Sequence, residues 1–457
     1  MNSYRIISLI SIFLSLTYGR SIENFGNSTI GDEHELHGKT GSHNMSGSIH
    51  DKVHDIHVAS WNYSYVGQPL LITLFIVAVC IIKILLHHAK RLEKLIPESC
   101  LLILLGIIFG FLFLVEGAQT ELAFFHFSPR SFFLFLLPPI ILEAAYSLKD
   151  RAFAENLGTI VLYAVVGTIL NVFIVGPTLF GFYLAGFMGD SMTLNFLECL
   201  IFSAIIAAVD PVAVLAIFEE IGVNKMLYFM VFGESLFNDA VTVVLYNMVL
   251  SFMQIDQLGV REFGLGFAAF LCVSLGGMAI GTFYGFMTAL ATKYSTKLRV
   301  LEPAIIYGVA YLSYISAELF HFSGIISIIC CGLIQSYYAA ENISSKSFIT
   351  VFHFSKVMSS IAESLIFIIL GVMLVNEYKS WANFNVGFSL IAVFLCILSR
   401  FAVVFFLAYI VNSVVVSVRK IRRQEQFIMF RHCIVPAYTS RQQQKAPRVL
   451  YRLTWCG

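Results

Sequence analysis

The stretch MLYFMVFGESLFNDAVTVVLY, residues 226–246, places Glu234, Asn238 and Asp239 inside a run that is otherwise nearly all apolar. A second carboxylate, Asp210 in AAVDPVAV (207–214), has equally apolar neighbours. A charged group at the centre of a membrane helix costs roughly 2.5–3.5 kcal/mol, and such groups usually line a transport pathway or pair with each other. The two aspartates therefore indicate function more than structure.

The composition predicts that the chain uses lipid as its solvent. Of 457 residues, 58% are hydrophobic and 12% are charged, against about 25% charged residues in a typical soluble domain. A soluble chain of this size cannot bury so much apolar surface in one core. We therefore expect an all-α polytopic membrane protein. The net charge of +1 says nothing about partners, and no nucleic acid is expected.

Residues 1–65 precede the long apolar runs. Arg5, the apolar run after it and small residues near Gly19 predict a signal peptide over 1–19, with an uncleaved anchor helix as the alternative. Residues 20–65 read as a glycosylated, His-rich extracellular arm with sequons at Asn27, Asn44 and Asn62. We interpret it as a disordered, solvated arm; metal binding or pH sensing by its histidines is the alternative. It contains no cysteine, so no disulfide framework is implied.

Residues 66–418 form the predicted transmembrane domain, in which eleven apolar runs are near the length that crosses a bilayer. With the N-terminus outside, Lys and Arg residues gather in alternate loops, as the positive-inside rule requires. The runs are 68–88, 98–115, 131–148, 158–187, 194–219, 226–252, 264–291, 301–320, 323–340, 348–375 and 385–418.

Residues 419–457 form a basic tail on the cytosolic side, with nine Lys and Arg residues and one acidic residue, Glu425. Such a cluster beside a membrane is attracted to anionic inner-leaflet lipid. A solvated, positive-inside tail without a specific partner explains it equally well.

Among the ionisable side chains within the predicted spans, eight are candidates for a functional role: Glu143, Glu198, Asp210, Glu234, Asp239, Glu318, Glu363 and Arg400. Glu198 is near a span end and can face the interface. For Glu143, Glu318 and Glu363, a protonated or hydrogen-bonded carboxyl group between helices is as good an interpretation as a functional one. Glu234 and Arg400 are the most plausible internal charge pair.

Asp210 is followed by Pro211, which lacks a backbone N–H and disfavours helix at the preceding residue. Helices broken near the middle of the membrane build the ion sites of many secondary transporters. Asn238 supplies a neutral oxygen beside Asp239, and hard cations such as sodium prefer oxygen ligands. Because burial disfavours the charged form of a carboxyl group, one aspartate could hold a proton or a cation in turn. Competition of this kind predicts exchange.

Four stretches, 132–160, 207–246, 311–325 and 359–372, closely resemble the animal sodium/proton exchangers, in particular their plasma-membrane branch. The resemblance extends over roughly residues 65–429. It implies an inverted-repeat cation/proton antiporter fold with a dimer domain, a mobile core domain and two unwound helices that cross. It also implies a homodimer without a cofactor that exchanges one sodium ion for one proton and regulates intracellular pH, sodium and volume.

The resemblance assigns roles to eight residues of this chain. Asp239 would carry the cation and the proton, with Asn238 as its companion and Asp210 at the helix crossing. Glu234 and Arg400 would form a charge pair that stabilises the core. Amiloride-type inhibitors would act around Phe133, Leu134 and Glu318.

After Met429 the sequence departs from the family pattern. The family continues there into a glycine-rich helix, one more span and a regulatory cytosolic tail, whereas this chain ends in a polar, basic segment. We therefore expect an incomplete second repeat and the loss of the usual tail partners, calmodulin and calcineurin-like proteins. The alternative function is a truncated, non-transporting isoform that dimerises with full-length exchangers and regulates them, and it could be retained in the membranes of the secretory pathway.

The third functional hypothesis is that the protein is an enzyme. Two intramembrane aspartates occur in the aspartyl proteases of membranes, but those use a Gly-x-Gly-Asp setting, and here the context is Phe-Asn-Asp-Ala. The chain also has no Gly-x-x-x-x-Gly-Lys loop that would couple it to ATP. The sequence therefore predicts a transporter and not an enzyme.

Overall fold

The computed structural model describes residues 63–88, 98–115, 132–188, 193–208, 215, 218, 223–255, 259–295, 301–376, 385–414, 426 and 429. The predicted signal peptide, the extracellular arm with its three sequons, and nearly all of the basic tail lie outside these residues.

Every regular element in these ranges is helical. The α-helices are α2 (Tyr63–His88), α4 (Glu98–Val115), α7 (Leu137–Ser147), α8 (Arg151–Val161), α9 (Gly167–Leu184), α10 (Phe196–Ile206), α12 (Lys225–Phe252), α13 (Val260–Tyr294), α14 (Glu302–Leu319), α15 (Gly324–Ile334), α16 (Ala340–Asn342), α17 (Ser345–Asn376) and α18 (Val386–Val414). Three π-helical turns continue from or into them: η3 (Phe132–Leu136), η4 (Leu162–Val166) and η5 (Gln335–Ala339).

Each of the eleven predicted apolar runs overlaps a helix in the described ranges, although the run 194–219 is helical there mainly over α10, Phe196–Ile206. Six helices there have the length and apolar composition to cross a membrane, among them the continuous helices Arg151–Leu184 and Gly324–Asn342. The predicted run 158–187 begins too late, because the first two turns of α8 carry Arg151, Glu155 and Asn156 and lower the local hydropathy. The all-α, polytopic prediction is confirmed.

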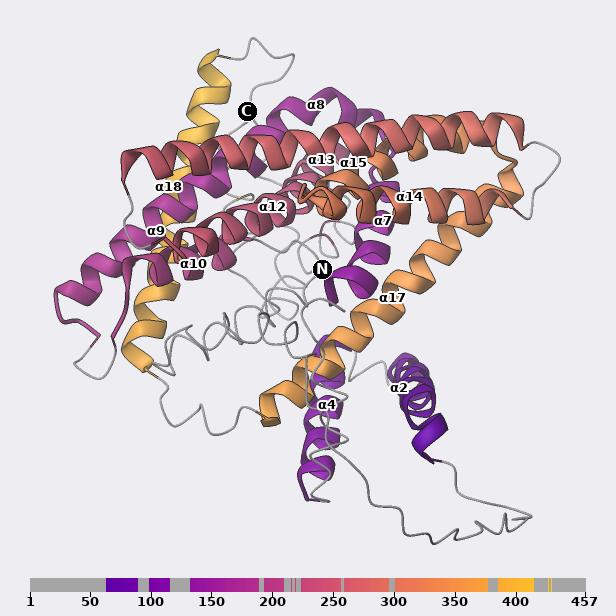
Figure 1. Cartoon of the computed structure of the whole chain (residues 1–457), viewed down its shortest axis with the longest axis horizontal. Helices are drawn as coiled ribbons and strands as arrows, with labels where there is room; N and C mark the ends of the chain where they lie inside the picture. The colour runs from indigo at the N-terminus through magenta and orange to yellow at the C-terminus, as the bar shows by residue number, and fades with distance from the viewer. Residues whose placement is uncertain are drawn as a thin grey trace, which may run out of the picture.

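The helices pack as two bundles (Figure 1). In what we call bundle one, α8, η4, α9, α10, α12 and α18 contact each other. In bundle two, α4, α7, α13, α14, α15 and α17 do so, with α2 against α4 and α17. Contacts between the bundles are fewer and involve mainly α12, which meets α13, α15 and α7. The assignment of these bundles to the core and dimer domains that the family resemblance implies stays a prediction.

Glycines set the closest helix contacts of bundle two. A Cβ atom on Gly106 of α4 would lie 2.1 Å from the Ile368 carbonyl oxygen of α17, and one on Gly371 of α17 would lie 2.2 Å from the Ile103 carbonyl oxygen. Along α13, Gly281 faces the backbone of Ser327 in the same way. Small residues let membrane helices approach backbone to backbone.

The helix α10 ends four residues before Asp210, where the sequence predicts a break. The helix stops at Ile206, and Ala207 forms its C-terminal cap. Asp210 and Pro211 themselves lie outside the described residues. The second unwound helix and the inverted repeat remain predictions.

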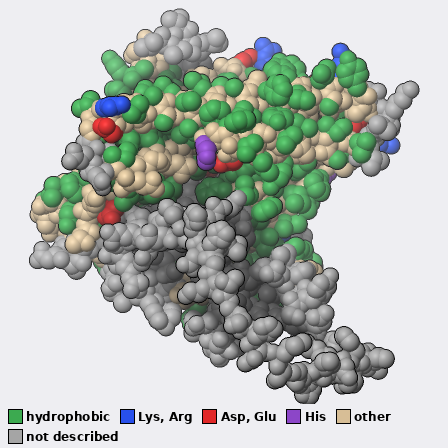
Figure 2. Space-filling model, viewed as in Figure 1, with side chains coloured by type: hydrophobic (Ala, Val, Ile, Leu, Met, Phe, Trp, Pro, Cys, Tyr) green, Lys and Arg blue, Asp and Glu red, His purple; other side chains and the backbone are tan. Residues whose placement is uncertain are grey.

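The outer surface is strongly apolar. Figure 2 shows that hydrophobic side chains predominate on the coloured part of one face, with a few charged groups along its edges and one histidine beside an acidic group near the middle of the view. Large exposed apolar side chains follow α13 from Phe263 through Phe283 to Leu290. In a chain whose helices can cross a membrane, such a surface fits contact with lipid.

Candidate functional site

Asn238 is the centre of a buried polar cluster in bundle one. Its side chain is 1% exposed, and its Nδ2 donates to the Ala207 carbonyl oxygen at 3.2 Å. Its Oδ1 lies 2.8 Å from the Thr168 hydroxyl of α9 and 3.2 Å from the Thr242 hydroxyl one turn further along α12. Asn238 therefore connects three helices, and it contacts α10 at the residue where that helix ends.

The Thr168 hydroxyl has two acceptors within reach. It lies 2.7 Å from the Ala164 carbonyl oxygen of its own helix, in addition to Asn238 Oδ1. A hydroxyl group carries one hydrogen, so it can donate fully to only one of them at a time. The cluster therefore has two hydrogen-bonding arrangements that differ by rotation of one hydroxyl group.

Asp239 follows Asn238 on α12 and is half-buried, and it interacts with other groups of the chain. Its predicted partner Asp210 lies outside the described residues. The structure thus places Asp239 beside the Asn238 cluster and leaves the predicted meeting of the two aspartates untested.

Glu234 and Arg400 form the internal ion pair that the sequence predicts. Arg400 Nη2 of α18 donates to Glu234 Oε1 of α12. The two side chains are 4% and 6% exposed, so both charges are removed from solvent and compensate each other. The pair joins α12 to α18 one turn before Asn238.

In the predicted inhibitor region, Phe133 and Leu134 are hydrogen-bonded to α14, the helix that carries Glu318. The Tyr314 hydroxyl donates to the Phe133 carbonyl oxygen at 2.9 Å, and the Tyr311 hydroxyl donates to that of Leu134 at 3.1 Å. Both acceptors belong to the π-helical turn η3.

Glu318 lies one turn beyond Tyr314 on α14. Its Oε1 accepts the Gly324 amide at 3.0 Å, at the start of α15. A carboxylate near a helix N-terminus stabilises that helix. Glu318 therefore stabilises the start of α15, in addition to its predicted role in inhibitor binding.

The other intramembrane carboxylates are in hydrogen-bonded settings. Glu143 of α7 accepts from Ser147 at 3.2 Å, and Glu198 accepts the Asn195 amide at 2.9 Å at the start of α10. Ser359 lies 3.5 Å from Glu363 in α17. For Glu143 this supports the structural interpretation that the sequence left open, and Glu198 caps the start of α10.

Sequence reasoning missed Thr168, Thr242, Tyr311 and Tyr314. Thr242 is four residues after Asn238, so helical spacing could have indicated it. The other three reach their partners from separate helices, and no local pattern marks them.

Comparison with known proteins agrees with this architecture. Residues 74–434 match the family model described as sodium/hydrogen exchanger, transmembrane. The chain is 51% identical over 384 residues to "Na(+)/H(+) exchanger protein 7" of Caenorhabditis elegans, covering 84% of this chain and 49% of that protein. It is 41% identical over 396 residues to "Na(+)/H(+) exchanger beta" of Oncorhynchus mykiss, covering 87% of this chain and 51% of that protein. The chain thus spans about half the length of these relatives.

Among solved structures, the chain is similar to the sodium proton antiporter MjNhaP1 from Methanocaldococcus jannaschii. The TM-score is 0.57 at 19% identity, over 81% of this chain and 85% of the other. This likeness concerns the fold, and it shows an antiporter fold for the described helices. From the family match and the identities above, the chain is a multi-pass membrane protein of the sodium/hydrogen exchanger family.

Proposed function

We propose that this chain exchanges extracellular sodium for intracellular protons across the plasma membrane and thereby regulates intracellular pH, sodium and volume. Asp239 is the exchanging carboxylate, Asn238 holds the site, and Asp210 contributes from the interrupted helix. The observation that carries the proposal is the Asn238 cluster, because it ties the residue before Asp239 to the carbonyl group at the end of α10.

The charges in bundle one support a one-for-one exchange. Glu234 is compensated by Arg400 within the protein, so this pair leaves no charge for a transported ion to balance. Asp239 bears one negative charge when ionised, and either a proton or a sodium ion neutralises it. If the same carboxylate carries one sodium ion in one direction and one proton in the other, equal charge crosses the membrane both ways. The exchange is therefore electroneutral.

The two-bundle packing supports alternating access. The Asn238 cluster and the Glu234–Arg400 pair lie entirely within bundle one. Few contacts connect this bundle to bundle two. Bundle one can therefore carry an intact site from one side of the membrane to the other, while bundle two remains in place.

The experiment is recovery of cytosolic pH after an acid load, in cells that lack endogenous exchangers and express the 457-residue chain. The proposal expects recovery that requires external sodium. No recovery, with the chain glycosylated at Asn27, Asn44 or Asn62 and present at the surface, would refute transport by this chain.

The second candidate is a subunit that dimerises with other exchangers and regulates them without transporting ions. What supports it is the exposed apolar surface of α2 and α4, including Leu74, Ile81 and Phe111, to which another exchanger subunit could bind. Co-expression with a full-length exchanger tests it. The candidate fails if flux and trafficking of the full-length protein stay unchanged and no mixed dimer is isolated.

A further inference from the structure

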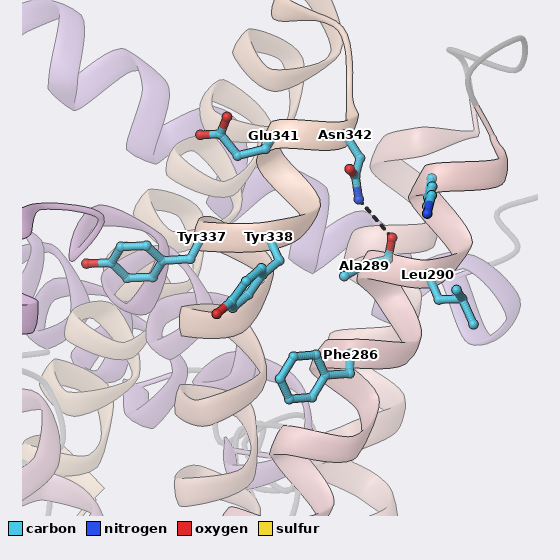
Figure 3. A pocket seen from close by; sticks show the side chains of 8 residues that line it. Phe286, Ala289, Leu290, Tyr337, Tyr338, Glu341 and Asn342 are labelled. Atoms are coloured by element: carbon cyan, nitrogen blue, oxygen red, sulfur yellow. Dashed lines mark hydrogen bonds between the residues drawn. The ribbon is translucent and has the colours of Figure 1, made fainter.

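A groove of about 550 Å³ lies between the last turns of α13 and the segment formed by η5 and α16 (Figure 3). Figure 3 shows Glu341 and Asn342 at one end of it and Phe286 at the other. The Asn342 Nδ2 donates to the Ala289 carbonyl oxygen at 2.9 Å and joins the two walls. This hydrogen bond fixes the two walls relative to each other. The groove is open to the outer surface, because its lining side chains Phe286, Leu290 and Tyr338 are exposed.

One end of the groove is apolar. Phe286 and Leu290 are 52% and 56% exposed, and Tyr338 of the opposite wall is 57% exposed. The Phe286 and Tyr338 rings contact each other, with centroids 5.7 Å apart. These side chains continue the apolar outer face of α13, so a hydrocarbon chain fits along them.

The other end of the groove carries the charge. Glu341 pairs with Lys149 at 3.0 Å, so its negative charge is already compensated. Lys293 lines the groove, is exposed and forms no ion pair with any residue that the structure describes. Among the described residues of the groove and its wall, two lysines and one glutamate give a net charge of +1, and Lys293 is the lysine available to a ligand.

The spacing of the two ends fits one leaflet of a membrane. Phe286 and Lys293 are separated by two turns of α13, about 10 Å along the helix axis. Tyrosines such as Tyr337 and Tyr338 are typical of the level at which hydrocarbon meets headgroups.

Basic residues identify the side of the membrane. Lys149 pairs with Glu341 in the groove wall, and Lys225 pairs with Asp150 at 3.7 Å. The Tyr337 hydroxyl donates to the Asp150 carbonyl oxygen at 2.8 Å, so these groups share one end of the molecule. Lysines gather at the cytosolic ends of spans, and the cytosolic leaflet carries anionic lipids that attract them.

We propose that this groove binds a glycerophospholipid of the cytosolic leaflet with an anionic headgroup. An acyl chain lies along Phe286 and Leu290, and the headgroup phosphate lies at Lys293. The groove lies on other helices than the candidate ion site in bundle one.

The experiment uses the full chain in phosphatidylcholine vesicles that contain a small fraction of phosphatidylserine with a photoactivatable acyl chain. After illumination, the labelled residues are mapped by mass spectrometry. We expect labelling at Phe286, Leu290 or Tyr338. Lys293→Gln should lower it about five-fold, the factor expected for one basic residue at an anionic surface.

Two further variants keep the test specific. Ala289→Phe fills the groove without removing a charge and should abolish the labelling, whereas Lys346→Gln removes an exposed lysine outside the groove and should leave it unchanged. Gel filtration and thermal unfolding confirm that each variant is folded.

Four results would overturn the proposal. The first is equal labelling by photoactivatable phosphatidylcholine, and the second is labelling that survives both Lys293→Gln and Ala289→Phe. The third is suppression by inorganic phosphate to the level of Lys293→Gln, which would assign the site to free phosphate. The fourth is crosslinking of the groove to a second copy of the chain in place of lipid.

Discussion

Arg400→Met is the substitution from which we expect the largest loss of stability. It removes the guanidinium group and keeps most of the side-chain volume, while Glu234 stays buried at 4% exposure. The second carboxylate oxygen of Glu234, Oε2, has no hydrogen-bond donor among the residues that the structure describes. A buried charge left without its partner costs about 3–5 kcal/mol, and we expect a loss of that size.

The double variant Glu234→Gln with Arg400→Met separates charge from packing. It leaves no buried charge, so it avoids the cost of a lone buried carboxylate, which is the larger penalty when one partner of a buried pair is removed. It should therefore be more stable than Arg400→Met alone. The free energy of unfolding is measured by titrating sodium dodecyl sulfate into the protein in mild detergent.

A matched control comes from the exposed pair of Arg151 and Glu155, whose side chains are 91% and 59% exposed. Arg151→Met should cost less than about 1 kcal/mol, because solvent screens such a pair. The reasoning is refuted if Arg400→Met costs no more than this control, or if the double variant is no more stable than Arg400→Met.

Three other substitutions have definite expected outcomes. Asn238→Ala removes the donor to the Ala207 carbonyl and should lower the free energy of unfolding by about 1–3 kcal/mol in the same titration. A change near zero would show that the Asn238 cluster does not stabilise bundle one. Gly371→Ala should sharply lower the yield of monodisperse protein, because its Cβ would lie 2.2 Å from a carbonyl oxygen of α4, whereas Gly158→Ala meets nothing within 4 Å and should not. Tyr314→Phe removes the hydrogen bond to η3 and should lower the free energy of unfolding by about 0.5–1.5 kcal/mol. It should also change inhibition by amiloride, and unchanged inhibition would show that this contact of α14 is not part of the inhibitor region.

Hydropathy predicted where the apolar helices of the described ranges lie, because a span must be long and apolar regardless of its packing partners. It could not predict the π-helical turn at Phe132–Leu136. That turn has the same composition as an α-helix, and its carbonyl groups depend on hydroxyl donors from α14. Such partners are a property of the tertiary structure.

The ionisable residues of the candidate site could be predicted from the sequence, because charged side chains are rare within apolar runs. Glu234 and Arg400 could be paired because each is a buried charge that requires a counterpart. Thr168 could not be found in this way, since a threonine in a membrane helix usually bonds its own backbone, as this one also can at Ala164. Its contact with Asn238 follows only from the packing of α9 against α12.

The central claim is that Asp239 exchanges sodium for protons, and sodium uptake by the purified chain in vesicles tests it most directly. An outward-directed proton gradient is imposed, and uptake of radioactive sodium is compared for the unmodified chain, Asp239→Asn and the exposed control Glu155→Gln. The account predicts gradient-dependent uptake by the unmodified chain and the control, and none by Asp239→Asn at equal incorporation. Uptake by Asp239→Asn at the rate of the unmodified chain would contradict it.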